Sequence, residues 1–100
     1  MNDYYLIQKD SYNKELPLHA FDFKDLQTLL RYMMMMQFIE VIDEDDIGHN
    51  SINLKGLIDR IAFTDKFNES CVLYRRQRMV RIGRTYELNN EIKKVLRKGK

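Results

Sequence analysis

A dense run of arginines constrains the fold of this chain more than any other feature. Five of its eight arginines fall within ten positions, and apolar residues are interleaved with them. The five are Arg75, Arg76, Arg78, Arg81 and Arg84. A guanidinium keeps its charge at physiological pH and is rarely buried unless it is paired. Residues 72–88 must therefore lie at the surface, or find carboxylate partners within the fold.

Residues 69–78 are predicted to form an arginine-bearing helix, and residues 79–88 a β-hairpin. Gly83 stands at the first of two central positions between short runs of strand-forming residues, which suits a type II′ turn. The alternative for the first half is a strand. An alternating strand over 72–82 would place the arginines on one outer side of a sheet. Periodicity leaves both interpretations open for residues 72–78.

The rest of the chain indicates one small α+β domain, since 100 residues is the size of a single domain. Residues 1–20 predict an N-terminal strand or hairpin, because Tyr4-Tyr5-Leu6-Ile7 is aromatic and β-branched. Residues 21–97 predict a helical core that includes the hairpin at 79–88. Three main helices are expected, the first from about residue 23 through the methionines at 33–36 and the others at 52–63 and 69–78, with a short last helix at 91–97. Residues 37–42 suit either a continuation of the first helix or a strand. Asp22 is the expected cap of the first helix.

This order of elements resembles the winged helix-turn-helix superfamily over about residues 23–90. The most family-like piece is MVRIGRTYELN at 79–89, which is similar to the wing of bacterial and phage regulators. The resemblance implies that 69–78 is the recognition helix and that Gly83-Arg84 is the tip of the wing. It also implies a role as a transcriptional regulator or a replication accessory protein.

Charge is divided unevenly along the chain. Residues 1–50 hold four Lys/Arg and ten Asp/Glu, a net of −6, whereas residues 51–100 hold thirteen and five, a net of +8. Such a split favours a half that binds a polyanion, and arginine forks contact phosphates and guanine edges in pairs of hydrogen bonds. The sequence therefore predicts nucleic-acid binding through the five arginines. The alternative is that the two halves neutralise each other within the fold.

Protein binding is the second class of function that the sequence supports. Four consecutive methionines, 33–36, make one helical turn apolar all round, and the acidic stretch 40–46 would act as a phosphate mimic against a basic groove. In size and composition the chain is similar to small phage-encoded inhibitors of host enzymes and defence systems, including anti-CRISPR proteins. The partner would then be a host nucleic-acid-binding protein, and a homodimer through the Leu/Met helix is a further expectation. The expected contacts are Met34, Met35, Glu40, Asp43, Glu44, Asp45 and Asp46.

Catalysis, metal binding and cofactor binding are not expected. His19 and His49 lack a nucleophile or carboxylate at a telling spacing, and the apolar neighbours of Cys71 favour a packed thiol. A calcium loop beginning at Asp43 would place Leu54 where a bidentate Glu is required. No apolar run approaches a membrane span and the N-terminus lacks the order of a signal peptide, so a cytoplasmic protein is expected.

Overall fold

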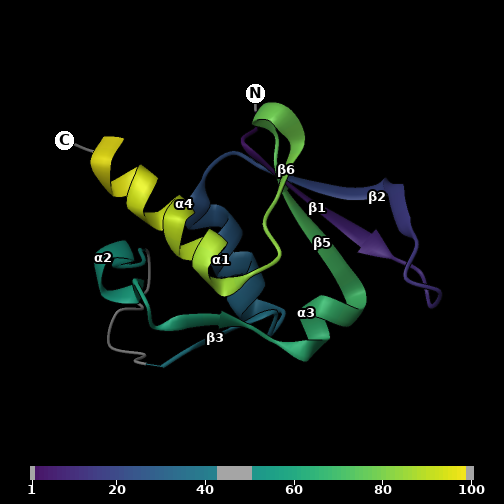
Figure 1. Cartoon of the computed structure of the whole chain (residues 1–100), viewed down its shortest axis with the longest axis horizontal. Helices are drawn as coiled ribbons and strands as arrows, with labels where there is room; N and C mark the ends of the chain where they lie inside the picture. The colour runs from purple at the N-terminus through teal and green to yellow at the C-terminus, as the bar shows by residue number, and fades with distance from the viewer. Residues whose placement is uncertain (1, 43–50, 99–100) are drawn as a thin grey trace.

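The computed structural model describes residues 2–42 and 51–98. Its fold is α+β (Figure 1). In chain order the elements are β1 (Tyr4–Lys9), β2 (Glu15–Phe23), α1 (Leu26–Met35), β3 (Ile39–Val41), α2 (Leu54–Leu57), β4 (Ile61–Phe63), α3 (Asp65–Ser70), β5 (Cys71–Arg75), the 3₁₀ turn η2 (Gln77–Met79), β6 (Val80–Arg81) and α4 (Thr85–Lys98).

The main sheet is antiparallel and has the strand order β2-β1-β5-β6, while β3 and β4 form a separate two-stranded sheet. The predicted N-terminal hairpin is therefore confirmed as β1 and β2. Its turn is stabilised by the Asp10 carboxylate, which accepts the backbone N–H of Tyr12 and of Lys14 at 2.8 and 2.9 Å. Asn13 adopts a left-handed φ of 70°, which asparagine tolerates better than most residues.

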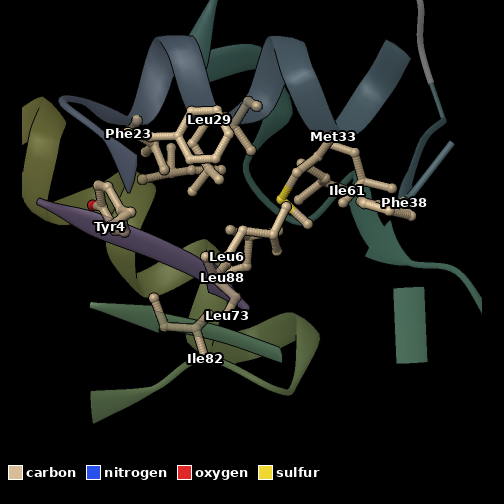
Figure 2. Close-up of a cluster of buried hydrophobic side chains, with 14 of the residues drawn as sticks. Tyr4, Leu6, Phe23, Leu29, Met33, Phe38, Ile61, Leu73, Ile82 and Leu88 are labelled. Carbon is tan, nitrogen blue, oxygen red and sulfur yellow. The ribbon is translucent and has the colours of Figure 1, made fainter. Parts of the chain in front are cut away.

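The core lies between one face of the main sheet and the helices α1 and α4. Figure 2 shows Tyr4, Leu6 and Leu73 from the sheet close to Leu29 and Met33 of α1. Each fully buried aliphatic side chain contributes about 1.5–3 kcal/mol relative to an exposed one. Both long helices belong to this one cluster, and Figure 1 shows them together on the same side of the sheet.

The first helix begins later than the sequence predicted. Asp22 belongs to β2, and Asp25 is the cap, accepting hydrogen bonds from the Thr28 backbone N–H (2.9 Å) and hydroxyl (2.8 Å). The expected second helix at 52–63 is also wrong, because α2 spans only Leu54–Leu57. Asp59 then adopts a left-handed φ of 63°, and residues 61–63 pair with β3 instead.

The expected recognition helix at 69–78 is wrong. Thr64 caps α3 by accepting the Phe67 N–H at 3.3 Å, so that helix starts and ends several residues earlier than predicted. Residues 71–75 follow as the buried strand β5, which confirms the strand alternative for this part of the chain. A strand alternates its side chains between two faces, which suits the run Cys-Val-Leu-Tyr-Arg better than a helical stripe does.

The expected C-terminal hairpin at 79–88 is wrong too, and the winged-helix arrangement fails with it. Within residues 79–88 only Val80 and Arg81 form a strand, β6, which pairs with β5, and the chain then enters α4. The Glu87 carboxylate accepts the backbone N–H groups of Gly83 and Arg84 at 3.2 and 2.9 Å, which stabilises the start of a helix. Leu88 and Ile92 share one helical face and are fully buried, so they belong to the same helix rather than to a strand and a later helix.

Candidate nucleic-acid interface

The structure divides the five arginines into two groups. Arg75 and Arg76 lie where β5 ends, are half-buried, and pair with carboxylates. The other three, Arg78, Arg81 and Arg84, are exposed in the connection between β5 and α4. Neutralisation within the fold and availability to a partner therefore apply to different arginines.

Arg75 is directed toward α4. Its Nε lies 3.5 Å from Oε1 of Glu91, whose side chain is buried. The same carboxylate accepts the Tyr4 hydroxyl at 3.1 Å and lies 3.3 Å from the Lys94 ammonium. Burial and the negative charge of Glu91 raise the pKa of Tyr4 well above its usual range. Tyr4 therefore remains a neutral hydrogen-bond donor to Glu91.

Arg76 joins the end of β5 to β1 and β2. Its Nε donates to the Asn2 carbonyl at 2.7 Å, and its terminal nitrogens donate to the Tyr5 hydroxyl and, at 2.9 Å, to the Asp22 carboxylate. The guanidinium also lies over the Tyr5 ring, 3.8 Å from its centroid. Asp22 comes from the acidic half of the chain, so this pair is one real case of neutralisation between the halves.

Residues 77–84, here named the arginine turn, carry the three exposed arginines. Among residues 2–42 and 51–98, no side chain forms a hydrogen bond or an ion pair with the guanidinium of Arg78, Arg81 or Arg84. Met79 remains 48% exposed, so apolar surface accompanies the charge. The turn is anchored by buried Ile82, whose N–H donates to the Leu73 carbonyl at 2.8 Å.

The backbone of the arginine turn is strained. Arg78 and Met79 have φ angles of 63° and 47°, in the left-handed region that favours glycine. Each such residue costs roughly 1–2 kcal/mol. Strain of this kind persists where the surrounding structure imposes it, and it is concentrated at functional sites. The firmly held ends, Arg76 and Ile82, are that surrounding structure here.

A cleft of about 380 Å³ lies beside the turn, lined by its first residue, Gln77, by the start of α1 and by α4. Three cations line it, but so do three carboxylates, which makes its charge mixed. They are Arg75, Lys94 and Lys98, and Asp3, Asp25 and Glu91. The carboxylates oppose the binding of a phosphate within the cleft, so the arginine turn is the better polyanion contact.

The residues proposed for protein binding are only partly assembled. Met35 is 72% exposed, Met34 is half-buried and Glu40 is exposed. Met34 and Glu40 line an open groove of about 750 Å³ beside β3, and the 3₁₀ turn η2 that begins the arginine turn lies away from it across the main sheet (Figure 1). The remaining members of the set, Asp43, Glu44, Asp45 and Asp46, lie outside the described residues.

Two tyrosines of this region were not identified as site residues from the sequence. Tyr5 and Tyr74 stand directly opposite each other on the neighbouring strands β1 and β5. Burial, followed by the Glu15 hydrogen bond and charge, raises the pKa of Tyr74. The alternation of Val72 with Tyr74 is the signal that marks this face, but it becomes visible only once 71–75 is known to be a strand.

No cluster of three or more His, Cys, Asp or Glu side chains suited to a metal ion occurs in the part of the chain that the structure describes. Across the same residues, every helix is too short or too polar to span a membrane. Cys71 is buried, and burial raises the pKa of its thiol.

Comparison with protein-family models, with curated proteins and with solved structures finds no match for this chain. The functional argument therefore depends on the geometry of the arginine turn and of its surroundings.

Proposed function

We propose that this chain binds nucleic acid through the arginine turn. The observation that carries the proposal is the division of the arginines. Arg75 and Arg76 make internal contacts that hold the turn, while Arg78, Arg81 and Arg84 project from it without partners among the described residues. Exposed guanidinium groups on a fixed backbone are suited to bidentate contacts with phosphate oxygens.

One phosphate contact from each of Arg78, Arg81 and Arg84 sets the affinity that we expect. Electrostatic binding that is independent of sequence typically gives dissociation constants of about 10⁻⁴ to 10⁻⁶ M at physiological salt. We therefore expect micromolar affinity or weaker from the turn alone, and stronger binding at lower salt. The half-exposed Met79 adds apolar contact with sugar or base surfaces.

The test is fluorescence anisotropy of a labelled oligonucleotide titrated with three proteins. They are the wild type, a triple variant of the turn (Arg78→Ala, Arg81→Ala, Arg84→Ala) and a control with the same loss of charge elsewhere (Lys14→Ala, Lys24→Ala, Lys55→Ala). The control lysines are exposed and lie outside the turn. The turn variant should lose at least tenfold in affinity and the control should lose much less. Equal losses in both variants would show that net charge, rather than the turn, causes the binding.

Protein binding at the groove beside β3 is a second candidate function, favoured by one observation. Ile42, which lines the groove beside β3, is 79% exposed, and Met35, which follows the groove residue Met34 in α1, is 72% exposed. Large apolar side chains exposed together mark many interaction surfaces. In a pulldown from bacterial lysate, a specific partner should be retained by the wild type and lost with Ile42→Glu. A partner retained equally by both proteins would count against this groove.

A further inference from the structure

The face of the main sheet that lies away from α1 and α4 carries a group of aromatic and charged side chains. Strand alternation places Tyr5 and Ile7 of β1, and Val72 and Tyr74 of β5, on this face. Their neighbours Tyr4, Leu6 and Leu73 belong to the core with α1 and α4, whereas Ile7 and Val72 are buried outside that core cluster. We name this surface the outer face; the long helices α1 and α4 pack on the opposite face of the sheet.

One transverse row of the outer face crosses all four strands. Asp22 of β2 stands opposite Tyr5, Tyr5 stands opposite Tyr74, and Tyr74 stands opposite Arg81 of β6. Two aromatic rings therefore lie at the centre of the sheet, with an exposed arginine on one side. The carboxylate on the other side is already paired with Arg76.

Tyr74 lies along the sheet rather than standing away from it. Its hydroxyl donates to Glu15 at 2.8 Å, and Glu15 stands opposite Lys9, four positions along β1 from Tyr5. To reach that carboxylate the Tyr74 ring must pass over the neighbourhood of Ile7. A ring in that position is consistent with the low exposure of Ile7, 7%. The Tyr74 side chain is itself half-buried, so part of its surface remains open to solvent.

Arg76 supplies a second flat surface next to it. Its guanidinium lies on the Tyr5 ring at 3.8 Å and is fixed by Asp22 and Asn2. Nucleobases stack on guanidinium planes as well as on aromatic rings. The outer face thus offers two adjacent stacking surfaces, with Arg81 beside them to contact a phosphate.

We propose that the outer face binds single-stranded nucleic acid, with bases stacked on Tyr74 and on the Arg76–Tyr5 pair and the backbone held by Arg81 and Arg78. The inference rests on the proposed function and restricts the expected ligand from nucleic acid in general to single strands. In a duplex the flat faces of the bases are occupied by their neighbours, so a stacking surface of this kind selects unpaired strands. Stacking on an aromatic side chain does not depend strongly on base identity, so weak sequence preference is expected.

The absence of tryptophan from the chain makes the test direct. Tyr74→Trp introduces a single indole on the outer face, and Tyr12→Trp places a control indole in the β1–β2 turn, where the native side chain is 89% exposed. Oligothymidine at saturation should quench the indole fluorescence of the Tyr74→Trp variant and leave that of the Tyr12→Trp control unaffected. Unchanged fluorescence of Tyr74→Trp at a concentration where anisotropy shows saturation would overturn the inference.

Affinity measurements separate this inference from the proposed function. The wild type should bind oligothymidine roughly tenfold more tightly than a duplex of equal length, and Tyr74→Leu should remove most of that difference. Tyr74→Phe, which retains the ring, should preserve the difference in affinity between oligothymidine and duplex. Thermal unfolding checks that the variants fold. Equal binding of both nucleic acids with dependence on the arginine turn would refute the outer face and leave the proposed function intact. Failure of the wild type to bind either would refute both.

Discussion

Tyr4 and Glu91 are 87 positions apart in the chain and form a hydrogen bond of 3.1 Å between the first strand and the last helix. Glu91 is a buried carboxylate, which would be costly without partners. Tyr4, Arg75 and Lys94 are those partners. The contact therefore couples the hairpin, the arginine stretch and α4.

The first prediction concerns the Tyr4 hydroxyl. Tyr4→Phe should lower the free energy of unfolding by about 1–3 kcal/mol, because a hydrogen bond to a charged group is lost. The raised pKa of Tyr4 means that the unfolded state releases this proton near pH 10, whereas the folded state retains it. The stabilisation is therefore complete below about pH 10 and declines as pH rises further. Urea unfolding from pH 8 to 11 measures it.

In that experiment the difference in the free energy of unfolding between wild type and Tyr4→Phe should shrink above about pH 10. Tyr74→Phe is a useful comparison because Tyr74 also has a raised pKa. A gap that stays constant across the whole range would contradict the assignment to Tyr4.

The second prediction concerns the cap of α1. Asp25→Ala should destabilise the protein by about 1 kcal/mol, because the Thr28 N–H loses its acceptor. The Thr28 hydrogen bonds lower the pKa of Asp25, so its contribution is present above about pH 4 and is lost as pH falls through the lowered value. Asp25→Asn retains a cap without the charge and should show no such loss. Unfolding curves of the wild type and of Asp25→Asn at pH 3 and pH 6 make the comparison, and an equal loss of stability at pH 3 in both proteins would contradict the assignment to Asp25.

The third prediction separates the consecutive methionines. Met33 is fully buried in the core and Met35 is 72% exposed. Met33→Ala should therefore cost about 2–5 kcal/mol by loss of packing, whereas Met35→Ala should change stability by no more than about 0.5 kcal/mol. Denaturant unfolding of both variants gives the answer. Similar losses at the two positions would mean that Met35 is buried in solution, for instance in a dimer.

The fourth prediction contrasts two arginines that are two positions apart. Arg76→Ala should lower the free energy of unfolding by about 1.5–3 kcal/mol, because hydrogen bonds from a charged donor are lost. Arg78→Gly should cost nothing or stabilise slightly, since glycine accepts the φ of 63° without strain. Thermal unfolding distinguishes the two. A large loss with Arg78→Gly would indicate that the side chain has a structural role.

The N-terminal half of the sheet was predictable because its signals are local. Tyr4-Tyr5-Leu6-Ile7 is rich in strand formers, and Ser11-Tyr12-Asn13-Lys14 suits a turn, so a strand or a hairpin was expected there. The C-terminal half was not predictable from local pattern. The sequence around Gly83 suits a hairpin turn, but Glu87 accepts the Gly83 N–H and Leu88 is needed in the core, so a helix forms instead.

The arginine cluster was visible in the sequence, but its division was not. Which arginines are neutralised depends on the pairing of β5 with β1, which brings Arg76 to Tyr5 and to Asp22, 54 positions away. The same pairing creates the outer face from Tyr5 and Tyr74. Contacts over such separations are set by tertiary structure, so residue spacing alone does not reveal them.

The salt dependence of oligothymidine binding tests the central claim, the division of the arginines, most directly. Each phosphate contact on a single strand adds about −0.7 to the slope of the logarithm of affinity against the logarithm of salt concentration. Removing Arg78, Arg81 and Arg84 together should therefore make the slope less steep by roughly 2, while the Lys14, Lys24 and Lys55 control should retain the wild-type slope. An unchanged slope in the turn variant, or the same change in both variants, would contradict the claim that the arginine turn holds the phosphates.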